Sequence, residues 1–220
     1  MTSTNKIIDS AKLSTAQVEN MLNTFNFAQL PKPGTNKGER GQILESALGI
    51  KSGSDLRDMS DGELKTFTVG ESIAITSLGH CLPDIIDNSI PFRDSKVFQK
   101  LKQTIFAGFD KKDGAFIKSK TINQVNSPEC YEKLEEDYNY ISSQIKHAYA
   151  SRELLHTING PNGLLQIRTK AGKKSDGTYT PLLYKGTQLK NKYMAFFLCA
   201  SFGKEIVKKH LTSSWYHSII

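Results

Sequence analysis

The chain has 220 residues, of which 38% are hydrophobic, so it can bury a real core as one compact domain over residues 1–220. No apolar run approaches the roughly 18 residues of a membrane span, and the N-terminal MTSTNKIIDS lacks a signal peptide's apolar core, so we expect a cytoplasmic protein. The formal net charge of +7 favours a polyanionic partner without establishing one. Three scattered cysteines fit neither a disulfide framework nor a zinc site and predict buried thiols.

The first third of the chain predicts two amphipathic helices followed by a strand. Ser14 and Gln17 have capping-box spacing at the start of a helix from Leu13 to Phe25. After a loop rich in proline and glycine, GQILESALG makes a second apolar stripe, which Gly49 closes. An acid-rich turn then leads into a strand from Glu63 to Val69.

The rest of the chain continues to alternate helices and short strands. Apolar residues recur at helical spacing from Lys96 to Ile105, and the strands TIFAGF and GAFI flank a turn at Asp110–Asp113. A long amphipathic helix from Ser127 to Tyr149 is the expected scaffold of this half. The strands LLQIRTK and AFFLCA, separated by a polar Gly-rich loop, precede a short helix from Ser201 to about Leu211. The order predicts a mixed α/β domain.

The stretch GSDLRDMSDGELKTFT carries the sharpest chemical signal. Side chains alternate along a strand, so Glu63 and Lys65 share one face while Leu64 faces the other way. Asp58 lies five residues before Glu63, close enough for a turn to bring the two carboxylates together. Two such carboxylates suit Mg²⁺, and Lys65 beside them could orient a water that attacks a phosphodiester. The alternative interpretation is a solvated turn followed by a surface ion pair, because these residue types are common.

Other polar residues lie where they could border such a site. Glu45 flanks the apolar stripe of the second helix, and Lys100 lies beside the buried positions of the next. In LLQIRTKA, Gln166, Arg168 and Lys170 fall on one strand face, where Arg and Lys could contact guanine and Gln could pair with adenine. The alternatives are ordinary helix edges for Glu45 and Lys100, and a solvated polar face for the strand.

Five blocks of the sequence, together with the long helix, resemble the MutH family of DNA endonucleases. In chain order the blocks are KGERGQILESALG, DMSDGELKT, KVFQKLKQTIF, LLQIRTKA and AFFLCASF. That family includes the mismatch-repair nicking enzyme and related restriction endonucleases that cut GATC, within the PD-(D/E)xK nuclease fold. The resemblance covers roughly Lys37 to Leu211. It implies a restriction-endonuclease-like mixed sheet flanked by helices, with two lobes around a DNA cleft. It also implies Mg²⁺ as cofactor and double-stranded DNA, at GATC sites, as partner.

The resemblance also assigns roles to residues. It matches Asp58 and Glu63 to the catalytic acids and metal ligands, Lys65 to the catalytic lysine, Glu45 to an accessory helix acid and Lys100 to a supporting lysine. It further assigns DNA contacts. The resemblance places contacts with the DNA backbone at Lys37 and Gly38, and contacts with bases at Arg168 and Lys170. Phe197 occupies a position that the family links to methyl sensing.

The chain departs from the family pattern at three places. The first acid of the repair enzyme lies seven residues before the Glu, whereas Asp58 lies five before, so Asp55 and Asp61 remain rivals for its role. Thr169 stands where the family often has proline, and Phe197 where the repair enzyme has a tyrosine associated with adenine methylation. Phe197, together with the lack of an evident docking appendage, favours a type II restriction endonuclease. The alternatives are a repair nickase that needs a MutL-type partner, and a catalytically silent DNA-binding module.

Overall fold

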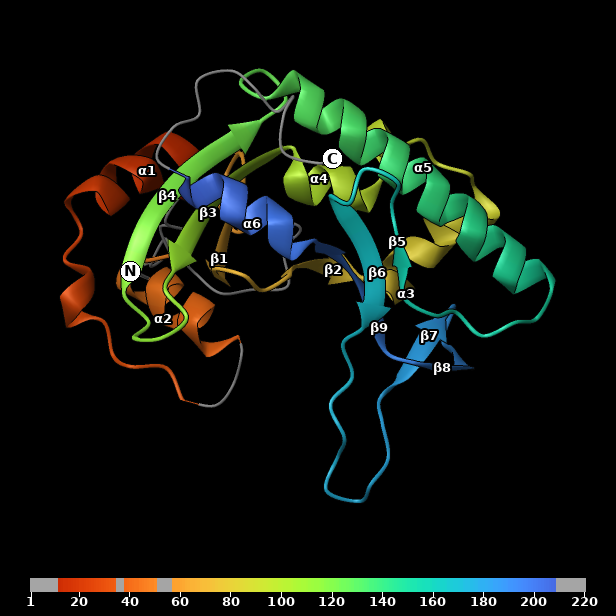
Figure 1. The fold of residues 1–220 in the computed structure, drawn as a ribbon. Coiled ribbons are helices and arrows are strands. Elements are labelled where there is room, and N and C mark those ends of the chain that lie inside the picture. The colour runs from red at the N-terminus through yellow and green to blue at the C-terminus, as the bar shows by residue number, and fades with distance from the viewer. Residues whose placement is uncertain (1–11, 35–37, 51–56, 209–220) are drawn as a thin grey trace, which may run out of the picture.

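The computed structural model describes residues 12–34, 38–50 and 57–208 (Figure 1). The helices are α1 (Thr15–Thr24), α2 (Glu39–Ala47), α3 (Leu78–Leu82), α4 (Lys96–Leu101), α5 (Pro128–Ala150) and α6 (Ala200–Val207). The strands are β1 (Glu63–Thr68), β2 (Ile73–Ser77), β3 (Gln103–Phe109), β4 (Phe116–Asn123), β5 (Ile158–Asn159), β6 (Leu165–Thr169), β7 (Pro181–Tyr184), β8 (Thr187–Lys192) and β9 (Met194–Leu198). Short helical turns are η1 (Phe27–Gln29), η2 (Pro83–Asp87) and η3 (Phe92–Asp94). The expected mixed α/β class is confirmed.

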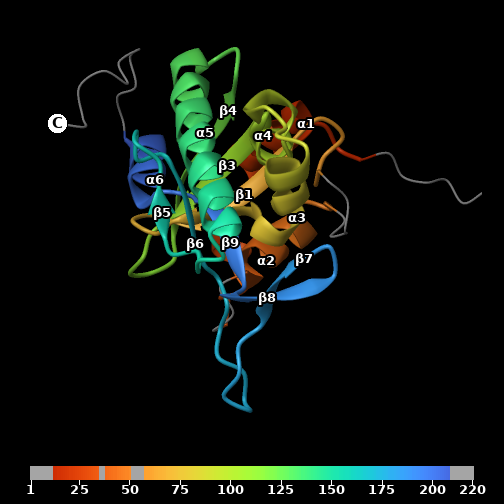
Figure 2. The same cartoon turned by 90° about the vertical axis from the view of Figure 1, so that its right-hand side faces the viewer.

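The strands of the described chain form three sheets. The first has the order β1-β3-β4, with β1 parallel to β3 and β4 antiparallel to it. The second has the order β2-β9-β6-β5 and is antiparallel throughout, while β7 and β8 form a separate hairpin. In Figure 1 the long helix α5 runs diagonally across the molecule above β6, and in the perpendicular view of Figure 2 it runs nearly vertically. Helix α2 lies at the lower side of the first sheet in Figure 1.

The two faces of the first sheet pack against different layers. Leu64 and Ile105 face α1 and α2, whose Val18 and Leu44 are fully buried in the same cluster. On the opposite face, Phe106 packs edge-on against a phenylalanine of α6 at 5.1 Å between ring centroids. Because side chains alternate along β1, Glu63 and Lys65 lie on the face opposite Leu64.

Helix α5 holds the second sheet in place. Tyr138, on its inner face, stacks on Phe196 of β9 at 6.0 Å between ring centroids. Asp137 is fully buried, and its carboxylate accepts backbone N–H groups of Asn162, Leu164 and Leu165 at 2.6 to 2.9 Å. The carboxylate therefore satisfies three backbone donors that would otherwise be buried without partners, and it fixes where β6 begins.

Several expected elements are confirmed, and others need correction. The first helix, the TIFAGF hairpin and the long helix lie close to their predicted ranges. The helix from Lys96 is shorter than expected, because Ile105 lies in β3, which pairs with strands on both sides. The polar Gly-rich loop after β6 contains the β7–β8 hairpin. The last helix is described as far as Val207, and the rest of its predicted range reaches residues outside the described part.

The expectation of buried thiols holds for two of the three cysteines. All three cysteines are free thiols, with Cys81 and Cys130 buried and Cys199 partly buried. Burial raises the pKa of the Cys81 thiol to about 12, and the nearby Asp84 charge acts in the same direction. Within the described residues, every helix is too short or too polar to cross a membrane.

Candidate active site

Strand β1 brings an acid and a lysine together on one face. The Nζ atom of Lys65 lies 2.5 Å from Oε2 of Glu63. The side chain of Glu63 is completely buried, whereas that of Lys65 keeps 21% of its surface exposed. The alternation that places the two residues on one face is therefore observed, and the carboxylate is far less accessible than that of an ordinary surface ion pair.

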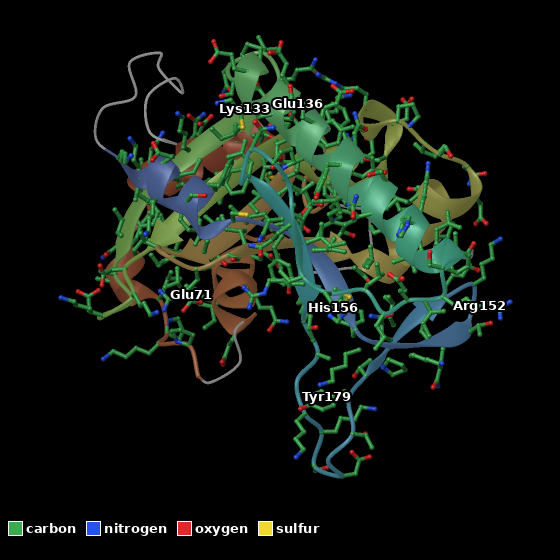
Figure 3. All side chains as sticks on the ribbon, turned by 45° about the vertical axis from the view of Figure 1, so that its right-hand side comes forward. Glu71, Lys133, Glu136, Arg152, His156 and Tyr179 are labelled. Atoms are coloured by element: carbon green, nitrogen blue, oxygen red, sulfur yellow. The ribbon has the colours of Figure 1, made fainter. Side chains whose placement is uncertain are left out.

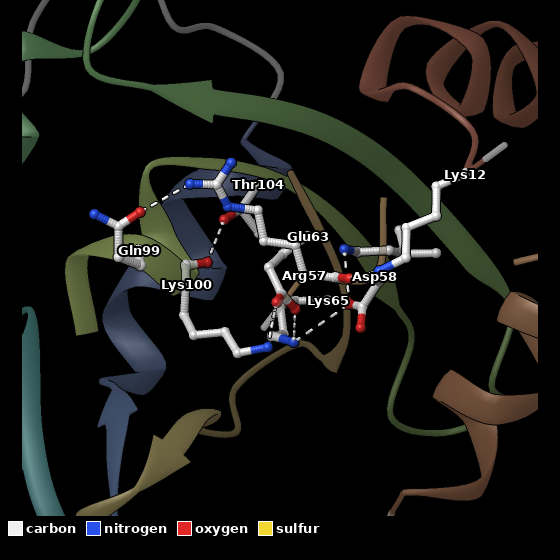
Figure 4. Close-up of polar contacts among 9 residues, drawn as sticks. Lys12, Arg57, Asp58, Glu63, Lys65, Gln99, Lys100 and Thr104 are labelled. Atoms are coloured by element: carbon white, nitrogen blue, oxygen red, sulfur yellow. Dashed lines mark hydrogen bonds and ion pairs between the residues drawn. The ribbon is translucent and has the colours of Figure 1, made fainter. Parts of the chain in front are cut away.

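A tight turn before β1 returns Asp58 to the same place (Figure 4). The N–H of Met59 donates to the carbonyl of Gly62 at 3.0 Å, which closes the turn. A Cβ on Gly62 would lie 2.6 Å from the carbonyl oxygen of Gln103, so this position needs glycine. Oδ2 of Asp58 then accepts the N–H of the second β1 residue at 3.3 Å and lies 3.7 Å from Nζ of Lys65.

Helix α4 supplies the second cation. Nζ of Lys100 donates to Oε1 of Glu63, so the two oxygens of this carboxylate each meet a different lysine (Figure 4). The carbonyl of Lys100 accepts the Thr104 hydroxyl at 3.0 Å, which ties the end of α4 to β3. Ser95 caps the other end by accepting the N–H of Phe98 at 3.1 Å. The position of Lys100 is thus fixed at both ends of its short helix.

Burial and charge oppose each other at the three groups on β1 and its turn. Burial raises the pKa of Glu63 to about 7, with the Asp58 carboxyl contributing, although both lysines act against it. Burial would also raise the pKa of Asp58, but contacts with Glu63 and Lys65 leave it below its usual value. Burial would lower the pKa of Lys65, yet the Glu63 and Asp58 charges raise it, and Glu45 adds to them.

The rival acids for the role of Asp58 have other positions. Asp61 accepts the backbone N–H and the hydroxyl of Thr15, both at 2.7 Å, and the Gln103 side-chain amide at 3.0 Å. It therefore anchors the first turn of α1 rather than facing Glu63. Asp55 lies outside the described residues. Asp58 is thus the acid that the described turn brings to Glu63.

Helix α2 borders the site. A Cβ on Gly41 would lie 3.2 Å from Oγ1 of Thr66 and 3.8 Å from Oε1 of Glu45, so α2 packs directly beside β1. Glu45 is half-buried, and its charge reaches Lys65 as described above. Gly38 is the N-cap residue of α2. Lys37 lies outside the described residues.

The donor set suits Mg²⁺. Asp58 and Glu63 place two carboxylates in contact, and Mg²⁺ commonly binds through one or two carboxylates while keeping its waters. Among the described residues, no three His, Cys, Asp or Glu side chains converge as a metal cluster, so water would complete the coordination here. Burial and the neighbouring Asp58 carboxyl raise the pKa of Glu63, and a divalent cation between the two carboxylates would relieve their repulsion.

The predicted base-reading face on β6 differs in part from expectation. Arg168 is exposed, and its guanidinium lies 5.3 Å from the ring centroid of Phe197. Gln166 is only 8% exposed and donates to Oγ of Ser72 at 3.0 Å, so it is held inside the fold. Lys170 lies just beyond the end of β6, and its N–H donates to the carbonyl of Tyr193 at 2.9 Å. Arg168 is therefore the strand's accessible cation.

Two residues that the sequence patterns do not single out support the site. Nη2 of Arg57 donates to Oε1 of Gln99 on α4 at 2.8 Å, and the carbonyl of Arg57 accepts Nζ of Lys12 at 2.7 Å. These bonds fix the residue immediately before Asp58 (Figure 4). Beside the second sheet, the hydroxyl oxygen of Ser72 accepts hydrogen bonds from the side chains of Gln166 and Arg168. No local periodicity signals these contacts, since each joins segments more than 40 residues apart.

No protein-family model matches the chain, and no curated protein matches its sequence at a significant level. The chemistry of the site therefore rests on its own geometry.

Proposed function

We propose that the chain is a Mg²⁺-dependent, sequence-specific DNA endonuclease with a restriction-endonuclease-like fold of two lobes around a DNA cleft. The observation that carries this proposal is the fully buried carboxylate of Glu63, held between Lys65 and Lys100 and in contact with Asp58. Burying a charged group costs several kcal/mol unless partners compensate it. Such a strongly perturbed cluster at the end of a strand is typical of catalytic sites.

The side chains divide the work of hydrolysis. Asp58 and Glu63 would hold Mg²⁺, which supplies Lewis-acid polarisation of the phosphodiester when bound. Lys65, beside both carboxylates, orients the attacking water and stabilises the negative charge that develops on the phosphate. Lys100 holds the second oxygen of Glu63, so the carboxylate cannot rotate away. Glu45 acts at longer range by keeping Lys65 protonated.

DNA is read on the second sheet in this proposal. The exposed Arg168 guanidinium presents two parallel donors, which match O6 and N7 of guanine in the major groove. The contact of the guanidinium with the Phe197 ring limits the orientations that the Arg168 side chain can adopt. Lys37 and Gly38 at the start of α2 are proposed to contact the DNA backbone. GATC is the expected site, from the resemblance of the sequence blocks.

A restriction endonuclease is preferred to a repair nickase. Phe197 has no hydroxyl with which to sense an adenine amino group, and its ring is already covered by Arg168. A nickase would need a MutL-type partner to activate it, whereas a restriction enzyme cuts alone. The third candidate, a silent DNA-binding module, predicts affinity for DNA without cleavage.

Time courses on a supercoiled, unmethylated plasmid with Mg²⁺ test the proposal. We expect the protein alone to produce nicked circles and then linear DNA. Lys65→Ala and Glu63→Ala should abolish cleavage while leaving DNA affinity within about tenfold, because phosphate contacts elsewhere supply most of it. Product that stops at the nicked circle until a MutL-type partner is added would establish the repair alternative. Binding without any cleavage by the wild type would establish the silent module.

A further inference from the structure

Residues 170–180, between β6 and β7, form an arm that extends away from the rest of the fold in two perpendicular views (Figures 1 and 2). The arm is a hairpin of its own. The N–H of Lys174 donates to the carbonyl of Thr178 at 2.8 Å, and that of Gly177 to the carbonyl of Lys174 at 3.0 Å. Lys173 and Tyr179 form a β-bridge. The backbone of the arm therefore has a defined shape.

The root of the arm is fixed to the core. The N–H of Tyr193 donates to the carbonyl of Thr180 at 2.7 Å, and its own carbonyl accepts the N–H of Lys170 at 2.9 Å. Beyond the root, Leu182 is fully buried and the hydroxyl of Tyr184 donates to Asp87 at 2.6 Å. The fold thus holds the base of the arm beside the end of β6, where Arg168 is exposed.

The arm and the adjacent strand β8 carry exposed cations that no acid balances. These are Lys170, Lys173, Lys174, Lys190 and Lys192. None of the five forms an ion pair with a carboxylate among the described residues. The arm's one acid, Asp176, is engaged by the N–H and hydroxyl of Thr178 at 2.9 and 2.6 Å. Three of these uncompensated charges lie on the projecting arm and two on the neighbouring strand, and together they form a surface for a polyanion.

We infer that this arm binds the phosphate backbone of duplex DNA outside the base pairs read by Arg168. The choice of duplex DNA rests on the proposed function. Lys173 follows Arg168 by five residues, so it lies at most about 17 Å further along the chain. One strand of B-DNA presents a phosphate every 3.4 Å or so along the axis, so Lys173 would reach at most about five base pairs beyond the contact of Arg168.

The side chains of the arm favour backbone contact over other modes of binding. Lysine is a flexible point charge that neutralises phosphates and carries little sequence information. Single-stranded RNA is usually held on open aromatic faces, but the ring of Tyr179 has Nζ of Lys192 only 3.8 Å from its centroid. A membrane surface would need apolar residues at the tip, and the sequence KAGKKSDGTYT offers none there.

The test compares two variants that lose the same charge. Lys173→Gln/Lys174→Gln removes two cations from the arm, and Lys133→Gln/Lys146→Gln removes two from α5. Figure 3 shows Lys133 at the opposite end of the molecule from Tyr179 of the arm. Binding to a 30-base-pair duplex of random sequence is followed by fluorescence anisotropy in EDTA, from 0.05 to 0.5 M salt.

The salt dependence gives the expected size of the effect. Each neutralised phosphate contributes about 0.9 to the slope of log affinity against log salt, so the arm variant should lose about 1.8 from the slope. At 0.1 M salt this corresponds to a loss of affinity of up to about 60-fold. The α5 variant should match the wild type. Equal slopes for the two variants would overturn the inference.

Two further measurements separate this inference from the proposed function. If the wild type never cleaves plasmid but the arm variant still loses slope on duplex DNA, the nuclease proposal fails and the arm inference stands. If the wild type cleaves and the arm variant keeps the wild-type slope, the reverse holds. A wild type that prefers poly(U) to the duplex, with this preference lost in the arm variant, would make RNA the ligand and overturn the assignment to DNA.

Discussion

Replacing Glu63 with glutamine removes the carboxylate that Asp58, Lys65 and Lys100 surround, while keeping the size of the side chain. Burial, assisted by the Asp58 carboxyl, raises the pKa of Glu63 from 4.5 to about 7 in the folded protein. Between these two pH values the folded state holds a proton that the unfolded state releases. The contribution of Glu63 to the free energy of unfolding is therefore fully present below pH 4.5 and is lost as the pH rises through this window.

The size of the effect follows from the shift. Each pKa unit corresponds to about 1.4 kcal/mol, so the free energy of unfolding should fall by about 3 kcal/mol between pH 4.5 and pH 7.5 through this group alone. Because the Glu63 side chain has no exposed surface, little of the effect is lost to screening by solvent. The glutamine of Glu63→Gln does not titrate, so between pH 4.5 and pH 7.5 the free energy of unfolding of the wild type should fall by about 3 kcal/mol relative to the variant.

Urea denaturation in EDTA at half-unit pH steps measures the difference between the wild type and Glu63→Gln. Glu71→Gln is the matched control, because 42% of the Glu71 side-chain surface is exposed and its ion pair with Lys111 is long, at 3.7 Å. The control should follow the wild type at every pH. Identical pH slopes for wild type and Glu63→Gln would refute the argument. Adding Mg²⁺ at pH 8 should stabilise the wild type and not Glu63→Gln, and at pH 5 the gain should vanish because the proton competes.

Three other substitutions probe the proposed base contact, the packing around Asp137 and the anchor of α1. Arg168→Ala should cost roughly 1 to 3 kcal/mol of binding on the cleaved sequence and little on random DNA, measured by competition; equal losses on both would make it a phosphate contact. Gly160→Ala would place a Cβ 2.1 Å from Cγ of Asp137, and should lower the free energy of unfolding by about 1 to 3 kcal/mol. Gly172→Ala, with open space around it, should not. Asp61→Ala should lower stability by about 1 to 2 kcal/mol through the lost hydrogen bonds to α1. It should leave plasmid cleavage intact, and a dead enzyme would return Asp61 to the list of metal ligands.

Local patterns predict the elements whose interactions are themselves local. Ser14 and Gln17 form the capping box that their spacing indicates, with the N–H of Ser14 donating to Oε1 of Gln17 at 2.8 Å. The shared face of Glu63 and Lys65 also follows from the period of a strand. Both features depend on side chains two or three positions apart, and the chain fixes such pairs as soon as the element forms.

The same patterns fail where tertiary contacts decide. Ile105 has helical spacing from Leu101, yet it lies in β3, which is central in its sheet and buried on both faces. A strand of that kind is a continuous apolar run, which periodicity does not distinguish from a buried helix. Strand β7 is only 4 residues long (PLLY) and β8 is mostly polar (TQLKNK), so neither gives a strong strand pattern in the sequence. The hairpin of these two strands forms because Leu182 is anchored in the core.

The candidate site shows the same division. Its acid and lysine on β1 are readable from the sequence, but the partner of Glu63 on α4 lies 37 residues away. Arg57 reaches Gln99 across 42 residues, and a sequence pattern gives no reason to connect them. The buried amide of Gln166 is likewise held by the hydroxyl of Ser72, which lies immediately before β2. The sequence therefore indicates the candidate groups, and the fold determines which of them are accessible.

The charges of the site explain how it can be stable without a ligand and still attract one. When Glu63 is ionised, above its pKa of about 7, the two carboxylates and two ammonium groups cancel, so the cluster of Asp58, Glu63, Lys65 and Lys100 can be partly buried without leaving a lone charge. With a divalent cation on the two carboxylates, the same cluster would carry a net positive charge. A phosphodiester gains negative charge at its oxygens as water attacks, so a cationic site stabilises the transition state more than the bound substrate. Under the proposed function, neutrality without the metal and positive charge with it would both favour hydrolysis at this position.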